Sequence, residues 1–329
     1  MDPEIVSVQE NIQKESHTLA RLKSEIGRII IGQEDMINKL LTGLLCSGHI
    51  LIEGVPGLAK SLAVSTLAAA LNTDFKRIRF TPDMLPADLI GTMVFNQKTG
   101  DFQVKKGPIF SSIILADEIN RAPAKTQSAL LEAMQERQVT IGDHTYKLDQ
   151  SFMVIATQNP IEQHGTYPLP EAQVDRFMLK LKLDYPSREE ELSILRVHGS
   201  DSIPAAGAVM QKGALEKAKQ VVHSIYMDEK IEKYIVDLTF ATRQPEKYGL
   251  EEIKGLIAYG ASPRASLYLK IGAKANAFLN GRGYVIPDDV MEVGYDTLRH
   301  RLILTYEAQA EDYLPEDVIA RIFKGVEVP

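Results

Sequence analysis

The sequence has little of what marks secreted, metal-binding or membrane-spanning proteins. Its 329 residues include one cysteine, so no disulfide can form within the chain and a reducing compartment is expected. Cys46 lies in an apolar stretch and is interpreted as a small buried side chain rather than a nucleophile. The seven histidines are scattered, without a pair at metal-ligand spacing. Nowhere do about 18 apolar residues follow one another, so no transmembrane helix is expected.

An excess of basic residues is also absent. The net charge is −7 and the isoelectric point is about 5.6. Broad binding of a nucleic-acid backbone needs a surplus of Lys and Arg on one face, so it is not expected as the main task, although a local basic pore stays open. The N-terminal residues MDPEIVSVQENIQKES lack the basic and apolar regions of a signal peptide. We therefore expect a cytoplasmic protein.

What the first half does contain is an alternation of short apolar strands with helices. Strands are expected at 49–53, 75–80, 112–116, 152–157 and 177–183, and helices at 61–71 and 124–137. Continuous apolar runs of this kind are typical of parallel strands that are buried on both faces. Two further segments, 93–106 and 138–148, predict hairpins with turns at Thr99-Gly100-Asp101 and Gly142-Asp143. The pattern predicts an α/β fold with a mostly parallel five-stranded sheet flanked by helices and two inserted hairpins.

The second half is predicted to be helical. A helix should begin at Ser187, and 199–213 is rich in small residues and resembles a linker. Helical spacing groups the apolar residues into two faces, one with Ile231, Tyr234, Ile235 and Leu238 and the other with Leu267, Ile271, Ala275 and Phe278. We expect an α/β core over 1–186, with an N-terminal helical segment at 1–25, and an all-helical domain over 187–329.

A phosphate-binding loop is the strongest motif. The motif comprises Gly54, Val55, Pro56, Gly57, Leu58, Ala59, Lys60 and Ser61, between a strand and a helix that continues with Leu62. Backbone N–H groups of such a loop surround phosphates, the lysine binds the β and γ phosphates of ATP, and the serine hydroxyl binds Mg²⁺. Ala59 stands where glycine is usual. This departure is harmless if the residue is right-handed and strained if its φ is positive.

Two adjacent carboxylates, Asp117 and Glu118, end the strand at 112–116. Open α/β sheets bind ligands at this edge. Asp117 is expected to hold Mg²⁺, directly or through water, and Glu118 to polarise the attacking water. The same pair would also suit an ordinary strand exit with solvated acids, but the phosphate loop favours the hydrolytic interpretation.

Six segments in this order resemble the MoxR family of AAA+ ATPases. They are Ile31-Gly32-Gln33, GVPGLAKS at 54–61, LADEINRAP at 115–123, ATQNP at 156–160, LPEAQVDRF at 169–177 and GASPRA at 260–265. The resemblance runs from about residue 25 to the end of the chain. It implies a P-loop AAA+ core with one hairpin in its second helix and another before the sensor strand, followed by a C-terminal helical lid domain.

The resemblance also implies roles for three residues. Asn159 would be a sensor of the γ-phosphate, Arg176 an arginine finger acting on a neighbouring subunit's ATP, and Arg264 a second sensor. Without the resemblance, Asn159 could equally belong to a turn, and Arg176 could be an ordinary surface arginine. For Arg264 there is a physical argument as well. Ser262 and Pro263 are typical of a helix start, where the dipole disfavours a cation unless an anion lies near.

The nucleotide base should rest against Ile30, Ile31, Gly32 and Gln33. Two roles are considered for Arg121: an interface or phosphate-linked residue, or a surface charge at a helix start. The family implies a ring, with a hexamer as the expected form. Our leading hypothesis is an ATPase that binds ATP or ADP with Mg²⁺ and acts as a chaperone, remodelling, activating or loading a cofactor into a client protein. A partner with a von Willebrand factor A domain is implied by the resemblance.

Three alternatives remain open. One is a nucleotide-gated scaffold with little turnover, which Ala59 favours and Glu118 opposes. A second is a machine resembling magnesium chelatase. The third is a nucleic-acid motor, for which the hairpin at 138–148 offers few cations, Lys147 and His144.

Overall fold

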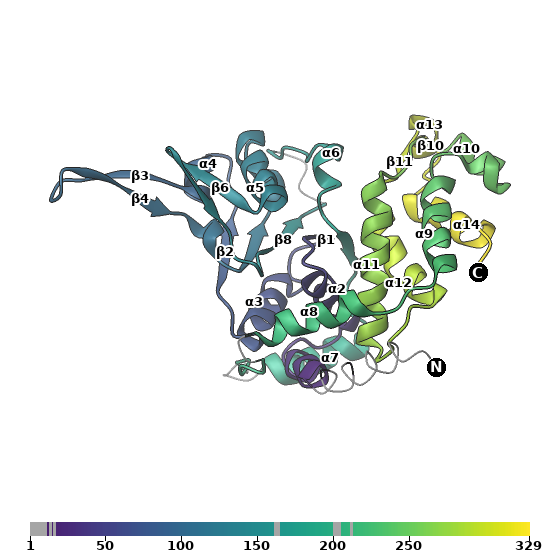
Figure 1. Ribbon diagram of the computed structural model, residues 1–329, viewed down its shortest axis with the longest axis horizontal. Helices are drawn as coiled ribbons and strands as arrows, with labels where there is room; N and C mark the ends of the chain where they lie inside the picture. The colour runs from purple at the N-terminus through teal and green to yellow at the C-terminus, as the bar shows by residue number, and fades with distance from the viewer. Residues whose placement is uncertain (1–11, 13–14, 16–17, 161–164, 200–204, 211–212) are drawn as a thin grey trace. The chain divides into compact units, whose positions relative to one another are not determined.

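The computed structural model describes residues 12, 15, 18–160, 165–199, 205–210 and 213–329, and the chain forms two compact units (Figure 1). The α/β unit comprises 20–177 and 181–212, and the helical unit comprises 213–329 with 178–180 and the N-terminal residues up to 19. In the N-terminal segment expected to be helical, residues 18–25 are helical and most of 1–17 lies outside the described residues. The linker-like stretch falls partly outside them too, at 200–204 and 211–212.

A five-stranded sheet forms the centre of the α/β unit. Its strands are β1 (Ile50–Gly54), β2 (Phe75–Arg79), β5 (Ile113–Asp117), β8 (Met153–Gln158) and β9 (Leu179–Leu183), in the spatial order β2-β5-β8-β1-β9. The β2–β5, β5–β8 and β8–β1 pairs are parallel. The predicted sheet is therefore confirmed. Because β5 and β8 are neighbours, the acid pair and the segment that leads to Asn159 end at the same edge.

Helices flank the sheet, as the apolar runs predicted, and α2 (Glu34–Leu45), α3 (Lys60–Ala70) and α5 (Ala124–Glu136) pack against it. The same unit contains α4 (Pro86–Ile90), α6 (Glu171–Val174) and α7 (Arg188–His198). Strand residues such as Ile114 and Val154 belong to the same buried cluster as Leu130 and Leu131 of α5. On α2, a Cβ on Gly43 would lie 2.6 Å from Ile50 Cδ1, so glycine lets that helix approach β1 closely.

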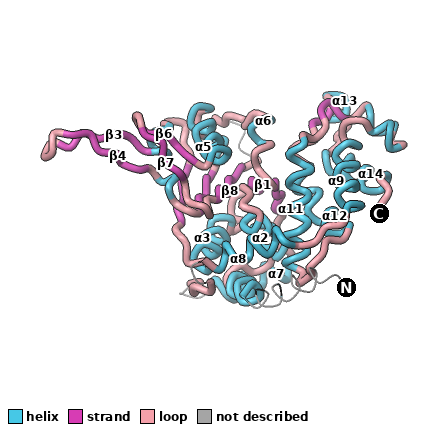
Figure 2. The backbone as a smooth tube through the Cα atoms, in the orientation of Figure 1, coloured by secondary structure: helices cyan, strands magenta, loops and turns pink. Residues whose placement is uncertain are grey.

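Both predicted hairpins are confirmed. The first pairs β3 (Gly91–Asn96) with β4 (Asp101–Lys106), between α4 and a 3₁₀ turn at Pro108–Phe110, and the second pairs β6 (Gln138–Ile141) with β7 (His144–Lys147) before β8. They differ in burial. Val139 and Ile141 of β6 are buried, whereas Phe95 and Phe102 of the first hairpin are 51% and 64% exposed. Figure 2 shows β3 and β4 projecting from the α/β unit.

The second unit is helical with one addition. Its helices are α8 (Ala214–Ser224), α9 (Glu229–Ala241), α10 (Glu251–Lys254), α11 (Pro263–Leu279), α12 (Pro287–Leu298), α13 (Tyr306–Ala310) and α14 (Pro315–Gly325), with a 3₁₀ turn at Pro245–Tyr248. The all-helical prediction missed the short antiparallel pair of β10 (Ile257–Tyr259) and β11 (Ile303–Leu304). These strands are three and two residues long, too short to show an alternating pattern.

The two predicted helix faces had different outcomes. On α9, Ile231, Tyr234, Ile235 and Leu238 are all buried, as expected. On α11, Ala275 and Phe278 are buried but Leu267 is 66% exposed, so its inclusion in the face was wrong. The buried stripe of α11 instead passes through Ala265, Leu269 and Gly272. Two of these three residues, Ala265 and Gly272, are small and carry little of the apolar signal from which a face is predicted.

Candidate nucleotide site

The phosphate-loop segment joins β1 to α3. β1 ends at Gly54 and α3 begins at Lys60. Gly57 has φ 90°, and a Cβ built on it meets no atom within 4 Å, so the loop borders open space. Ala59 has φ 53° and ψ 18°, the left-handed conformation. Because φ is positive, the alanine is strained, as expected for this case, and the conformation costs a residue with a Cβ about 1 kcal/mol.

The Lys60 ammonium curls back over this loop. Its Nζ donates a hydrogen bond to the Gly54 carbonyl oxygen at 2.6 Å. Burial lowers the pKa of Lys60, while the charges of Asp117 and Glu118 act in the opposite direction and raise it. The lysine thus lies in the field of the acid pair, at the start of a helix whose dipole also favours an anion.

Arginines from β2 and from the 3₁₀ turn at Ile119–Arg121, just after the acids, hold the two acids. The Asp117 side chain is buried, and its Oδ2 accepts from Arg77 Nε at 3.0 Å and Arg77 Nη2 at 2.5 Å. Glu118 Oε2 lies 3.0 Å from Arg121 Nη1 and Oε1 lies 3.6 Å from Arg79 Nη2. Arg121 thus contacts an acid of the site. Arg77 and Arg79 were not predicted, although their i, i+2 spacing on β2 places both on one face of the sheet.

A threonine on β8 contacts both acids. Thr157 Oγ1 donates to Asp117 Oδ1 at 2.7 Å and accepts the Glu118 backbone N–H at 2.9 Å. Glu118 has φ 56° and ψ 49°, a left-handed conformation that costs a residue with a Cβ about 1 kcal/mol. Asn159 follows two residues later and is buried. Sequence reasoning missed Thr157 because a threonine inside a buried strand is typical of β-propensity alone.

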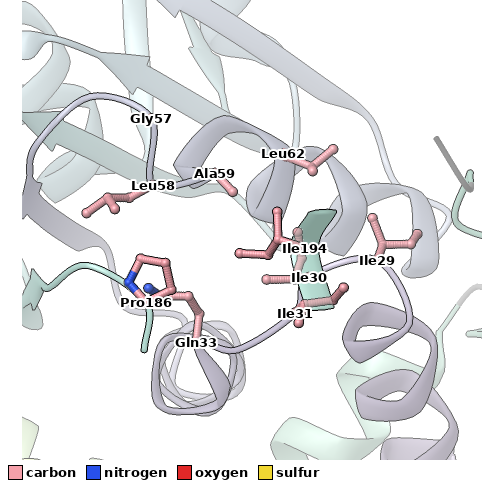
Figure 3. Close-up of a pocket in the computed structure, with 10 residues that line it drawn as sticks. All are labelled: Ile29, Ile30, Ile31, Gln33, Gly57, Leu58, Ala59, Leu62, Pro186 and Ile194. Atoms are coloured by element: carbon pink, nitrogen blue, oxygen red, sulfur yellow. The ribbon is translucent and has the colours of Figure 1, made fainter. Parts of the chain in front are cut away.

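An apolar cavity of about 190 Å³ lies beside the phosphate loop (Figure 3). Its walls are Ile29, Ile30, Ile31, Gln33, Gly57, Leu58, Ala59, Leu62, Pro186 and Ile194. Three of the four residues predicted to contact the base are among them, and Gly32 lies in the same turn. Apolar walls next to a phosphate loop fit the flat ring of a nucleotide base.

Two wall residues come from the segment around α7. Pro186 and Ile194 were not predicted, because Tyr185-Pro186 was interpreted as the end of the core. The α/β unit instead continues to residue 212 and includes α7. The helix is fixed by a capping box in which Ser187 N donates to Glu190 Oε2 and Glu190 N donates to Ser187 Oγ. The amphipathic character of this helix was a usable signal for an apolar wall.

The remaining predicted residues lie in two places. Arg176 follows α6 in the α/β unit, and its backbone N–H donates to Gln173 O at 3.2 Å. Arg264 is in the first turn of α11, in the helical unit, where its N–H donates to the Ser262 hydroxyl at 3.2 Å. The predicted cap at Ser262 and the proline at the first helical position are confirmed. The phosphate-sensing and finger roles of Asn159, Arg176 and Arg264 stay predictions.

The oxygen donors at the sheet edge suit magnesium. The Ser61 hydroxyl and the Asp117 carboxylate are hard oxygen ligands, and Mg²⁺ is usually bound by one or two such groups together with phosphates. Asp117 Oδ1 has one hydrogen-bond donor among the contacts above, so it keeps acceptor capacity for a metal or its water. Within the described residues, no group of three or more His, Cys, Asp and Glu forms a separate metal site. In the same part of the chain, no helix is long and apolar enough to cross a membrane.

Known proteins share this architecture. Residues 49–179 match the ATPase family associated with various cellular activities (AAA), and residues 251–322 match the AAA lid domain. A crystal structure of a protein from Cytophaga hutchinsonii, assigned as an ATPase, has a TM-score of 0.93 and 51% sequence identity and matches over the full length of both chains. Fold and site together define a protein of the AAA+ ATPase class.

Relatives that match over most of their length identify the family within this class. The chain is 48% identical to Chaperone MoxR1 of Mycobacterium tuberculosis, over 97% of this chain and 85% of the relative. It is 43% identical to the protein YeaC of Bacillus subtilis, over 96% and 97%, and 29% identical to Protein MoxR of Methylorubrum extorquens, over 94% and 95%. The chain belongs to the MoxR family of AAA+ ATPases.

Proposed function

We propose that this protein binds ATP with Mg²⁺ and hydrolyses it to ADP and phosphate. The observation that carries the proposal is the convergence at one sheet edge. The loop around Gly57, the Lys60 ammonium and the Asp117–Glu118 pair meet there, beside an apolar cavity suited to a base. Two residues of this arrangement, Ala59 and Glu118, are held in left-handed conformations. Strain of this kind is typical of functional sites.

Different residues of the site would bind the phosphates, hold the metal and activate the water in phosphoryl transfer. Backbone N–H groups of Val55 and of 57–61 and the Lys60 ammonium would bind the phosphates, and Ser61 with Asp117 would hold Mg²⁺. When bound, the metal neutralises charge on the phosphate oxygens. Glu118 would polarise the attacking water, because each of its carboxylate oxygens keeps acceptor capacity beside the contacts with Arg121 and Arg79.

A Glu118→Gln substitution tests the hydrolytic role. The amide keeps the shape of the side chain but cannot accept a proton, so phosphate release should fall roughly 100-fold or more. Binding of a fluorescent ATP analogue should stay close to that of the unchanged protein, because Glu118 is not among the phosphate-binding groups. Undiminished turnover in the variant would remove Glu118 from the mechanism.

We also infer that the active protein is a ring, hexameric in its expected form, in which Arg176 completes the site of the neighbouring subunit. Head-to-tail contacts of this kind close into rings. Support comes from family membership and from the suitability of a guanidinium as a fixed, planar donor to phosphate.

Mixing two inactive variants tests the shared site. Arg176→Ala should bind ATP and hydrolyse it roughly 100-fold more slowly. Mixed with Lys60→Ala, it should regain measurable phosphate release, because some interfaces would pair an intact phosphate loop with an intact arginine. Recovery with no dependence on the mixing ratio, or none at all, would contradict a site shared between subunits.

The biological task we propose is that of a chaperone, which uses ATP turnover to remodel, activate or load a cofactor into a client protein. The name of one relative, Chaperone MoxR1, supports this direction. A partner with a von Willebrand factor A domain belongs to the same proposal. The test is co-purification with the Glu118→Gln variant in ATP, which should retain a specific protein that ADP releases. A protein retained equally in both nucleotides would not be a client of the ATP cycle.

A further inference from the structure

The Thr157 side chain lies between the two hydrolytic residues. It is 1% exposed and sits on β8, where the register pairs Ala116 with Ala156 and so brings Asp117 beside Thr157. Valine has nearly the same shape and would serve the buried strand as well. The hydroxyl therefore needs a reason other than strand formation or packing.

The Thr157 hydroxyl donates one hydrogen bond to the acid pair and accepts another from it. As a donor it reaches Asp117 Oδ1 at 2.7 Å, and as an acceptor it takes the Glu118 N–H at 2.9 Å. Its one proton points at the metal-binding carboxylate, and its lone pair holds the backbone of the residue that polarises water. One side chain thus connects the group proposed to bind magnesium with the group proposed to act on water.

The second contact matters because of the Glu118 backbone. At φ 56° and ψ 49° this residue is left-handed, which side chains with a Cβ disfavour. The hydrogen bond from its N–H to Thr157 opposes relaxation toward the right-handed region. Such relaxation would re-aim the Glu118 carboxylate relative to the phosphate loop.

The first contact matters because Arg77 binds only the other oxygen of Asp117. Two N–H groups of Arg77 donate to Oδ2, whereas Thr157 fixes Oδ1. Without the hydroxyl, Oδ1 loses the donor that fixes its position, and the carboxylate is less restrained about its Cβ–Cγ bond. Its orientation toward a metal would then be lost, although its charge would remain.

We propose that Thr157 is a positioning residue that sets the Asp117 carboxylate for magnesium and the Glu118 backbone for water activation at the same time. The proposal rests on the proposed ATPase function. It adds a residue from the strand of Asn159 that acts through the two acids and not on the nucleotide itself.

The test compares Thr157→Val with Thr157→Ser. In steady-state phosphate release, Thr157→Val should lower kcat roughly 30-fold and change KM for ATP less than about threefold, because the phosphate loop is untouched. Thr157→Ser keeps the hydroxyl and should stay within about threefold of the unchanged protein in both constants. A serine variant as slow as the valine variant would show that methyl packing, and not the hydroxyl, is required.

A binding measurement separates positioning from turnover. Mn²⁺ titrated into the protein with a non-hydrolysable ATP analogue, followed by electron paramagnetic resonance, should bind roughly tenfold more weakly to Thr157→Val. Equal Mn²⁺ affinity in the two proteins would overturn the Asp117 half of the proposal. A kcat of Thr157→Val equal to that of the unchanged protein would overturn the Glu118 half.

A matched control removes another buried threonine hydroxyl from the same unit. Thr126 is fully buried, and its Oγ1 donates to the Met84 carbonyl at 2.7 Å. Thr126→Val should lose stability much as Thr157→Val does, yet keep kcat and Mn²⁺ affinity. Equal loss of kcat in both variants would mean a general structural effect and contradict the positioning role.

Two further outcomes are distinguishable. If Thr157→Val does not fold, Thr157→Cys replaces it, since a thiol of similar size is a weak donor and acceptor and should lie between serine and valine in kcat. If the unchanged protein and Glu118→Gln release phosphate equally, the proposed ATPase function fails. The Mn²⁺ titration still reports whether Thr157 orients Asp117.

Discussion

The two edges of the central sheet use polar side chains in opposite ways. At the amino edge, before β1, buried His49 accepts the Val154 N–H at Nδ1 and lies 3.2 Å from the Met134 carbonyl at Nε2. Nearby, Arg137 donates to the carbonyls of Ser47 and Gln150 at 2.7 and 3.2 Å. These side chains satisfy backbone groups of a strand, a helix and turns, which is a structural task.

At the carboxyl edge, charged side chains bind one another instead. Asp117 is held by Arg77, Glu118 by Arg121 and Arg79, and the backbone is left-handed at Ala59 and Glu118. The contrast teaches that the cost of a substitution should depend on the edge. Removing a phosphate-binding charge such as Lys60 at the carboxyl edge should remove activity and leave stability nearly intact, whereas changes at the amino edge should do the reverse.

The largest expected effect is at the carboxyl edge. Lys60→Ala should weaken binding of a fluorescent ATP analogue roughly 100-fold or more, because several charge-assisted contacts to phosphate are lost together. The midpoint of thermal unfolding should move by only a few degrees, since one hydrogen bond to Gly54 is removed. A large drop in the unfolding midpoint, with binding of the ATP analogue retained, would contradict the proposed difference between the two edges.

The next effect is at the amino edge and depends on pH. Burial lowers the pKa of His49 to about 4, below its ordinary 6.5. Between those values the unfolded chain binds a proton that the folded chain does not, so this contribution to stability is full above pH 6.5 and is lost as the pH falls toward 4. The loss should reach about 2 kcal/mol by pH 5 and about 3 kcal/mol at lower pH.

Denaturant unfolding at several pH values checks this prediction against His49→Gln, whose side chain is neutral throughout. The difference in free energy of unfolding between the two proteins should shrink as the pH falls from 7 to 5. A difference that is constant over this range would mean that His49 does not titrate as a buried group.

The smallest effect is expected for a substitution in the phosphate loop. Ala59→Gly relieves the left-handed alanine but adds freedom to the unfolded chain, so the free energy of unfolding should rise by no more than about 1 kcal/mol. Affinity for the ATP analogue should not fall, because no phosphate contact is removed. Lower affinity in the glycine variant would show that the Cβ of Ala59 contributes to the apolar cavity.

Much of the fold could be predicted because its signals are local. The apolar runs at 113–117 and 153–158 are long enough to specify buried strands, and both hairpins have glycine turns between alternating residues. The phosphate loop and the acid pair were located because each follows a strand. Leu267 was assigned wrongly to a buried face because most buried residues of this helix are alanines and a glycine, with Leu269 and Phe278 as the large ones.

What could not be predicted depends on contacts between distant residues. Thr157 and Arg77 each lie 40 residues from Asp117, and no periodicity indicates their hydrogen bonds. The sign of φ at Ala59 is set by how the loop closes onto α3. Likewise, residues 205–210 looked like a free linker, yet Val209 N and Met210 N donate to Ala70 O and Gly207 N to Glu25 Oε1. Backbone pairing of this sort leaves little trace in composition.

The most direct measurement is a crystal structure with a non-hydrolysable ATP analogue and Mg²⁺. The phosphates should lie against the backbone at 55–61, the base between Ile30 and Ile194, and the metal between Ser61 and Asp117. An analogue bound elsewhere, or a loop closed so that phosphate cannot enter, would contradict the assignment of this edge as the nucleotide site.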